Sequence, residues 1–271
     1  MSFRRPTVAL APSPRLGVRP LAVHRPLFGG PLPKRVASGE SGQVFLGHVG
    51  VGLALKRAVP SVNAGVLVAA ALLLDSLLGL FVLAGLEQVH LPEDFARRRY
   101  LTFSFPWSHG LLATLLWSAL AAALTWALLR GPARGWAALA VAVAVASHFP
   151  CDVIEHLPEL PLLGPDSTRL GLGLWRWMPW ALALEVALAA LGLVLYRRAT
   201  AGEFPWGMAL LVVGVAAVAL PGQLFSTAAP PREALVATWL LQAPLLGLGA
   251  GWLDARRRGR PPPAPQVTGL A

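Results

Sequence analysis

The feature that most constrains this chain is a series of apolar runs, each about as long as a membrane is thick. Six such runs are bounded by charged residues, Pro or Gly, and they cover residues 61–86, 109–130, 135–150, 178–196, 206–225 and 234–253. An α-helix needs about 20 apolar residues to cross the hydrocarbon core of a bilayer. Of all residues, 55% are hydrophobic and only 13% are charged, which excludes an ordinary soluble domain. We therefore predict an all-α fold, a polytopic transmembrane helical bundle with about six spans.

The segments around these runs have different compositions. Residues 1–42 are rich in Pro and Arg and are predicted to form a disordered basic tail. Residues 44–57 begin with an apolar stretch too short to span a bilayer, so a re-entrant or interfacial helix is predicted there. The transmembrane domain would cover residues 43–254, with its motifs in 44–178, and residues 255–271 would form a cytoplasmic Arg/Pro tail. A start of translation near Gln43 would fit the same pattern.

The distribution of charge predicts the orientation of the chain. Six spans place both termini on one side, and 17 of the 23 Lys and Arg residues then fall on that side. Because cytoplasmic loops of membrane proteins carry an excess of Lys and Arg, both termini are predicted to be cytoplasmic. The net charge of +10 is scattered over short loops and tails, so we expect no nucleic-acid partner. The single cysteine, Cys151, excludes an intramolecular disulfide.

The stretch Ser147 to Glu159 has the highest density of reactive side chains. His148, Asp152 and His156 are spaced i, i+4, i+8 and would share one face of a helix. Imidazole nitrogens and carboxylate oxygens suit a divalent ion such as zinc, and three protein ligands leave a position for water. Pro150 lies within the stretch, so Asp152 and His156 are alternatively placed on a new short helix. A polar helix end at the membrane surface would explain the same residues without a metal.

Other polar residues lie within or beside the apolar runs. Asp75 and Glu185 fall near the middle of two predicted spans, where an ionisable group is costly and needs a partner. His109 opens the second long run, and His48 lies in the short apolar stretch. Counting about 1.5 Å per helical residue from the cytoplasmic turns puts Asp75 and His148 at depths of about 22 and 20 Å. His109 comes out near 31 Å and His48 near 13 Å, so His48 is the least certain ligand.

These residues occur in an order that resembles a known family. His48, Asp75, the FPWSHG segment at Phe105 to Gly110 and the segment from Ser147 to Leu162 are similar to motifs of a family of bacterial integral membrane proteins. Its members are described as predicted membrane-bound, metal-dependent hydrolases. The resemblance covers residues 47–200. Gly110 replaces a serine of the family pattern, and a Pro-Asp-x-Asp motif of other branches is reduced to Asp75.

The resemblance implies a location, a cofactor and a function. We expect a multi-pass protein of the bacterial inner membrane, and the distribution of Lys and Arg described above predicts that the loop from Cys151 to Trp177 is outside. The expected ligands of a divalent metal, zinc before others, are His148, Asp152, His109, Asp75, His156 and His48. Of these, Asp75, His109, His148 and Asp152 would be catalytic. The expected reaction is hydrolysis near the outer leaflet of a phosphoester or lipid-like substrate, and the expected partners are the lipid bilayer and that small molecule.

Two other functions remain open. Asp75 and the histidines would also suit an ion or proton path through a transporter. Inverted repeats or paired broken helices would favour that function, and neither is visible in the sequence. The same polar residues would alternatively only hold together a membrane scaffold. Bound metal in a purified sample separates the hydrolase from both alternatives.

Overall fold

The computed structural model describes residues 45–201 and 204–257, and its fold is all-α apart from two short hairpins. The predicted tails, 1–42 and 255–271, fall outside the described residues except for 255–257. The helices are α1 (Leu46–Leu55), α2 (Ala64–Ala71), α3 (Leu73–Leu83), α4 (Phe95–Arg98), α5 (Leu111–Leu128), α6 (Arg134–Ala146), α7 (His148–Glu155), the 3-10 helix η1 (Leu174–Trp177), α8 (Met178–Ala199), α9 (Trp206–Phe225) and α10 (Arg232–Ala255). The strands are β1 (Gln88–His90), β2 (Thr102–Ser104), β3 (Leu160–Pro161) and β4 (Arg169–Leu170).

The predicted spans are found in the structure with two changes. Five helical segments are long and apolar enough to cross a membrane: α5, α6 with α7, η1 with α8, α9 and α10. The sixth candidate is the pair α2 and α3, which meet at Leu72 with a bend of 45° and form either a broken span or a re-entrant loop. The third span is longer than predicted and runs from Arg134 to Glu155. These helices are those of a membrane protein.

The short helix α1 lies inside the bundle. Seven of its ten residues are buried, and it packs mainly against α8 and α2. Its contact with α8 is close: a Cβ on Gly50 would lie 2.4 Å from the carbonyl oxygen of Leu188, and one on Gly192 would lie 2.1 Å from that of Gly50. Small residues permit such close approach of membrane helices. An interfacial helix buries one face only, so the interfacial alternative predicted for residues 44–57 does not describe α1.

A buried ion pair joins the turn after α1 to the end of α10. The ammonium of Lys56 lies 2.7 Å from the carboxylate of Asp254 and also donates to the carbonyl of Val62. The same carboxylate accepts a hydrogen bond from the amide of Ala64, at the start of α2. Both charged side chains are at most 6% exposed. The pair therefore fixes α1, α2 and α10 relative to one another, and with them the residues these helices carry.

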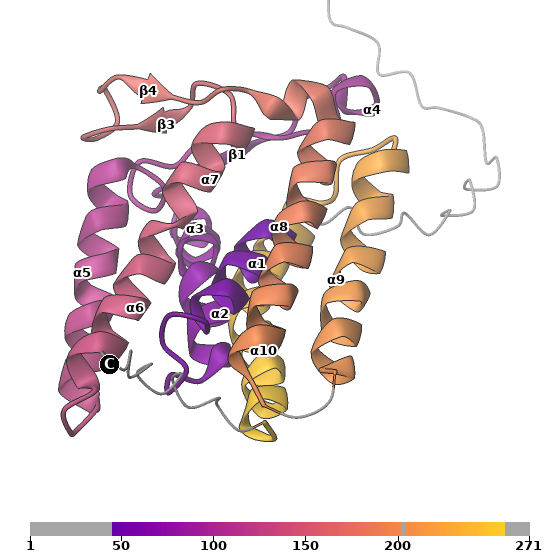
Figure 1. Ribbon diagram of the computed structural model, residues 1–271. Coiled ribbons are helices and arrows are strands. Elements are labelled where there is room, and N and C mark those ends of the chain that lie inside the picture. Colours follow the sequence, from indigo (N-terminus) through magenta and orange to yellow (C-terminus); the bar gives the residue numbers. More distant parts are fainter. Residues whose placement is uncertain (1–44, 202–203, 258–271) are drawn as a thin grey trace, which may run out of the picture. The chain divides into compact units, whose positions relative to one another are not determined.

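The two antiparallel hairpins lie at the end of the bundle where α3 ends and α5 begins (Figure 1). In one, β1 pairs with β2 through Val89 opposite Phe103. In the other, β3 pairs with β4 through Leu160 opposite Leu170. The segment Phe105 to Gly110, directly after β2, is thereby placed above the bundle interior. The sequence-based prediction of an all-α protein did not include these hairpins, which are too short to show alternation of apolar and polar residues.

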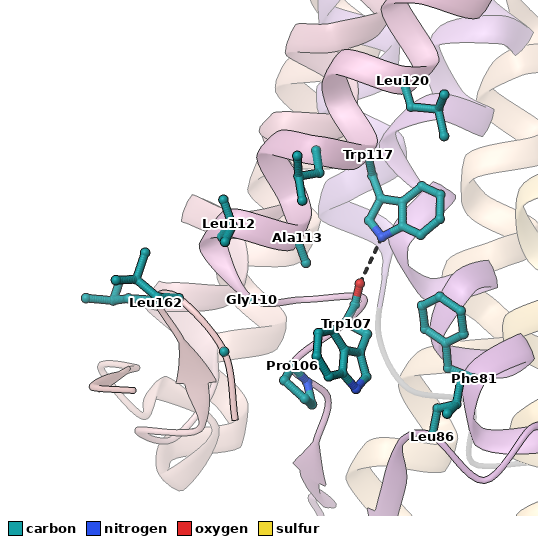
Figure 2. Close-up of a pocket in the computed structure, with 13 residues that line it drawn as sticks. Phe81, Leu86, Pro106, Trp107, Gly110, Leu112, Ala113, Trp117, Leu120 and Leu162 are labelled. Carbon is teal, nitrogen blue, oxygen red and sulfur yellow. Dashed lines mark hydrogen bonds between the residues drawn. The ribbon is translucent and has the colours of Figure 1, made fainter. Parts of the chain in front are cut away.

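Helix α5 packs against α6 and leaves most of its surface exposed. Only 11% of its span is buried, compared with 50% for the span formed by α6 and α7. A cavity of about 620 Å³ lies beside the first half of α5, between that helix, the end of α3 and the loop after β3 (Figure 2). Its walls are almost entirely apolar. In a membrane, this is a side of the protein that lipid contacts.

Candidate metal centre

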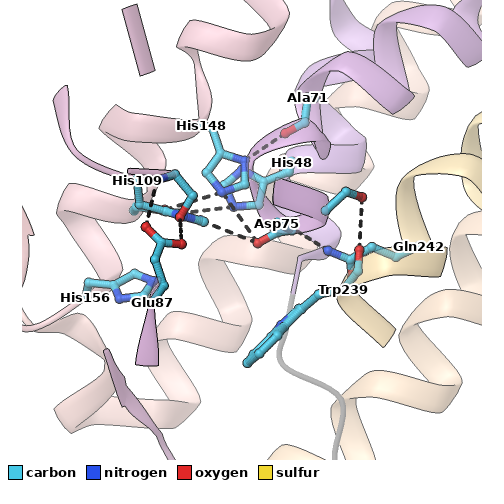
Figure 3. A network of polar contacts seen from close by, with 12 residues as sticks. His48, Ala71, Asp75, Glu87, His109, His148, His156, Trp239 and Gln242 are labelled. Carbon is cyan, nitrogen blue, oxygen red and sulfur yellow. Dashed lines mark hydrogen bonds and ion pairs between the residues drawn. The ribbon is translucent and has the colours of Figure 1, made fainter. Parts of the chain in front are cut away.

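Five side chains from four parts of the chain meet in the interior of the bundle (Figure 3). They are His48 from α1, Asp75 from the first turn of α3, His109 from the residue before the N-cap of α5, and His148 and Asp152 from α7. The three histidines and Asp152 are each no more than 5% exposed. Two overlapping sets of three among them could hold a metal ion. One set is His48, His148 and Asp152, and the other is Asp75, His109 and His148.

The spacing of the ligand atoms within each set is close to that around one ion. Asp152 Oδ1 lies 3.2 Å from His48 Nε2, and Asp152 Oδ2 lies 3.4 Å from His148 Nε2 and 3.7 Å from His109 Nε2. Asp75 Oδ1 lies 3.6 Å from His109 Nε2 and 3.7 Å from His148 Nε2. Adjacent atoms bound about 2.1 Å from one ion lie about 3.0 to 3.4 Å apart in octahedral or tetrahedral geometry. The measured pairs therefore need to move by only a few tenths of an ångström to share an ion, and a larger shift would be needed for all five residues to bind the same ion, because they form two sets of three.

The hydrogen bond of His148 leaves its Nε2 free for a metal. Its Nδ1 lies 2.8 Å from the carbonyl oxygen of Ala71, which can only accept, so Nδ1 carries the proton. Nε2 then has a lone pair directed at the two carboxylates. Protein ligands of metals are commonly oriented by such a bond from the second ring nitrogen. Because His148 has one available nitrogen, it can bind only one ion.

A carboxylate and a hydroxyl orient His109 in the same way. Ser108 Oγ lies 2.6 Å from Glu87 Oε2 and 2.7 Å from His109 Nδ1. Glu87 also accepts the amides of Trp107 and Ser108. An ionised Glu87 accepts only, so Ser108 donates to it and in turn accepts from His109 Nδ1. His109 Nε2 is then unprotonated and faces Asp75 and Asp152. Burial raises the pKa of Glu87, and the three hydrogen bonds counteract this by favouring the ionised form.

The carboxylates of the cluster have few other partners. Asp152 Oδ2 is buried without a hydrogen-bond partner, as is His48 Nδ1. Asp75 Oδ2 accepts the side-chain amide of Gln242, from α10. In the part of the chain that the structure describes, no Lys or Arg forms an ion pair with either aspartate. One buried and one largely buried carboxylate without a cation are costly, and a divalent ion would remove that cost.

The cavity at the cluster is small. Its volume is about 20 Å³, and its walls include four of the cluster residues together with Phe105, His156, Trp175 and Gln242. A cavity needs about 10 to 15 Å³ of this kind of volume to hold one water molecule. The space therefore accommodates a water or an ion but no organic substrate, which would require the walls to move.

Two expectations about the ligands differ from the structure. His156 is outside both sets of ligand atoms: it is the extended C-cap of α7, and its Nδ1 lies 2.7 Å from Glu159 Oε1. The i, i+8 argument fails because the helix ends at Glu155. His48, counted as the least certain ligand, makes the shortest contact in the cluster. The depth count assumed helices perpendicular to the membrane, whereas α1 lies inside the bundle and the α2–α3 span is bent.

Other residues of the site had not been predicted to belong to it. Glu87 and Gln242 orient His109 and Asp75, respectively. Gln242 lies in an apolar span, and an amide in that setting is a signal that could have been used. Glu185, noted as an intramembrane acid, accepts the amide of Gly47, next to His48. Glu155 accepts the indole N–H of Trp175 at the edge of the cluster cavity.

Comparison with known proteins adds no assignment to this geometry. No family model, no curated protein and no solved structure matches the chain.

Proposed function

We propose that this protein is a membrane-embedded, metal-dependent hydrolase that binds one divalent ion, zinc before others, at the cluster. The ligands would be His48, His109, His148, Asp75 and Asp152. Catalytic roles would fall to Asp75, His109, His148 and Asp152. The resemblance to bacterial membrane-bound metal-dependent hydrolases, stated above from the sequence motifs, agrees with this proposal. The location, an inner membrane with both termini in the cytoplasm, is part of the same proposal.

The observation that carries the proposal is the direction of the lone pairs. Nδ1 of His148 and Nδ1 of His109 each donate a hydrogen bond to a fixed acceptor. Their Nε2 lone pairs are therefore directed at the carboxylates of Asp75 and Asp152. Purely structural histidines would donate to these carboxylates instead, and the buried Oδ2 of Asp152 would then have a partner. An imidazole and carboxylate donor set suits zinc and other first-row divalent ions.

A bound ion would act as a Lewis acid and lower the pKa of a bound water. The protein would position the reactants through its own residues. Gln242 holds one oxygen of Asp75, and the other oxygen remains directed into the cluster. In the hydrolysis, the water oxygen forms the new bond to phosphorus or to the acyl carbon, and the bond to the ester oxygen breaks. The proton that the water loses is transferred to the departing oxygen.

Elemental analysis of protein purified without chelator tests the proposal. Wild type should contain about one first-row divalent ion per chain, and His148→Ala and Asp152→Asn should lose it, because removing a ligand weakens binding by well over tenfold. His90→Ala is the matched control: His90 is exposed, outside the cluster, and its ring forms a hydrogen bond with Ser104. Equal metal in all four proteins, or none in wild type between pH 6 and 8, would refute the proposal.

Hydrolysis itself needs a second measurement. Zinc-loaded protein in vesicles should release product from an ester-containing lipid, with product detected by mass spectrometry. Asp152→Asn should show no release. Metal binding without release from any ester tested would leave a metal-binding protein but would argue against a hydrolase.

The broken span gives some support to the transporter alternative. Asp75 lies in the first turn of α3, directly after the 45° bend, and transporters place ion sites at such breaks. A transporter of this type uses a pair of broken helices, and the structure bends only one pair among its described residues by this much. Metal or proton flux into sealed vesicles that depends on Asp75, without ester hydrolysis, would favour the transporter.

A further inference from the structure

The cavity beside α5, here called the lipid groove, has the shape and chemistry of a site for a hydrocarbon chain. Its walls include Phe81, Trp107, Ala113, Leu116, Trp117 and Leu120 (Figure 2). Its volume of about 620 Å³ lies within the range of small-molecule sites. Trp107 is held in the wall by a hydrogen bond from Trp117 Nε1 to its carbonyl oxygen. Because α5 is a candidate span with an exposed surface, the molecules beside this groove are bilayer lipids.

A second cavity, here called the vestibule, lies next to the lipid groove. It has a volume of about 290 Å³ and shares Leu86, Pro106 and Trp107 with the groove. Its other walls are more polar and include Glu159, and Arg169 of β4. Each carboxylate oxygen of Glu159 already has a partner, the amide of Phe103 for one and His156 Nδ1 for the other. The only hydrogen bond of the Arg169 guanidinium goes to a backbone carbonyl, and no carboxylate within the described ranges pairs with it. The vestibule therefore offers a free positive charge beside an apolar groove.

The vestibule also borders the metal cluster. Phe105 is a wall of both the vestibule and the small cluster cavity, and its ring contacts that of His109 edge-on, with ring centres 4.8 Å apart. Phe105, Pro106 and Trp107 are consecutive, so one short segment separates the lipid groove, the vestibule and the cluster. This series runs from an apolar part through a cationic part to the metal cluster. A phospholipid carries its acyl chain at one end and its phosphoester at the other, so a chain in the lipid groove would leave the phosphoester in the part that borders the cluster.

We infer that an anionic phospholipid of the surrounding bilayer binds here, with one acyl chain in the lipid groove and its phosphate in the vestibule near Arg169. The part of this inference that makes the lipid the substrate rests on the proposed hydrolase function. As a binding site, it stands on the cavities and the charge alone. Phe105 is then the side chain that must move to admit the scissile bond to the cluster.

Photo-crosslinking in vesicles tests the inference. The probe is phosphatidic acid with a diazirine on one acyl chain, present at low fraction in phosphatidylcholine, and crosslinked peptides are mapped by mass spectrometry. In wild type, label should concentrate on the groove walls and should be displaced more strongly by unlabelled phosphatidic acid than by added phosphatidylcholine. Ala113→Phe, which fills the groove, should reduce groove labelling by more than fivefold. Ala119→Phe, an exposed position of α5 outside the groove, should not.

The headgroup part is tested with a matched pair of arginines. Arg169→Gln should weaken displacement by phosphatidic acid by about two- to fivefold, the scale expected for an exposed ion pair. Arg176→Gln removes an exposed arginine that is not part of the vestibule and should have no effect. A thermal unfolding midpoint close to that of wild type shows that each variant is folded.

The outcomes separate the inference from the proposed function. Equal labelling of the two phenylalanine variants would mean that only ordinary surrounding lipid is detected, and would overturn the lipid site. Equal displacement by both lipids would overturn the role of Arg169. If the predicted labelling occurs but wild type holds no metal, the lipid site stands and the hydrolase does not. If metal is bound and an ester is hydrolysed but labelling does not distinguish the two phenylalanine variants, the hydrolase stands and its substrate is not a lipid bound here.

Discussion

Replacing Ser108 with Ala should weaken metal binding. The Ser108 hydroxyl contacts one proposed metal ligand, His109, at Nδ1, which is the ring nitrogen that would not bind the ion. The hydroxyl bridges two buried groups, at 2.6 Å from Glu87 Oε2 and 2.7 Å from His109 Nδ1. Without it, the His109 ring loses the bond that fixes its rotation and the position of its proton. Changes of this kind cost about 10- to 100-fold in metal affinity. That corresponds to about 1.4 to 2.7 kcal/mol of binding free energy.

The affinity is measured by competition between the purified protein in detergent and a zinc chelator of known affinity. Ser118→Ala is the matched control: Ser118 is also buried, and its hydroxyl donates to the carbonyl of Thr114 within α5, away from the cluster. Ser118→Ala loses one buried hydrogen bond and should lose about 0.5 to 1.5 kcal/mol of stability, whereas Ser108→Ala loses two and should lose about twice as much. Only Ser108→Ala should also lose zinc affinity.

Glu87→Gln gives the sharper test, because it keeps the size and shape of the side chain. Glu87 Oε1 accepts two backbone amides, so the amide nitrogen of the glutamine would replace Oε2 and donate to Ser108. The Ser108 hydroxyl would then donate to His109 Nδ1, and the proton of His109 would move to Nε2, which could no longer bind a metal. We expect a loss of affinity at least as large as for Ser108→Ala. Wild-type zinc affinity in both variants would refute the proposed orientation of His109.

Three further results are expected. Lys56→Met should lower the free energy of unfolding by about 3 to 5 kcal/mol, because it leaves the buried Asp254 carboxylate without its cation, and adding Asp254→Asn should recover part of the loss in thermal unfolding. Gly50→Ala should destabilise the protein by about 1 to 3 kcal/mol, since its Cβ would overlap the backbone of α8, whereas Gly135→Ala on α6 has no heavy atom within 4 Å of the new Cβ and should be neutral or stabilising. A chelator should lower the unfolding midpoint of wild type but not of His148→Ala.

The helices could be predicted from the sequence because hydrophobicity alone places them. Long apolar runs cannot leave backbone groups unpaired in a bilayer, so each run becomes a helix. The apolar runs do not indicate where a helix bends or which helices pack against each other. The bend at Leu72 is not marked by a proline or glycine beside it. The burial of α1 depends on close contact between Gly50 and Gly192, which are more than a hundred residues apart in the sequence.

It was easier to predict from the sequence which residues belong to the candidate site than how they are arranged in space. Asp75, His109, His148 and Asp152 were found because ionisable groups are rare in or beside apolar runs. The depth predicted for His109 was wrong because the count assumed that His109 lies on a helix. His109 instead precedes Gly110, the N-cap of α5. The residues that orient the ligands were missed, because Glu87 follows a span and reads as an ordinary charge of a loop. Only the hairpin of β1 and β2 returns the chain so that Glu87 meets Ser108.

The cluster also bears on why the bundle has this arrangement. Its members come from α1, α3, α7 and the segment before α5, and Gln242 adds α10. Helices in a bilayer gain little from apolar contact with each other, because lipid tails are equally apolar. Polar contacts and an ion shared by several helices are therefore a larger part of what holds them together than in a soluble protein. A ligand that binds only the folded state stabilises it by about 2.7 kcal/mol at a concentration 100 times its dissociation constant. If an ion is bound, the same five side chains that would hold it also join the bent α2–α3 pair to the buried α1, and a substitution among them should impair assembly and activity together.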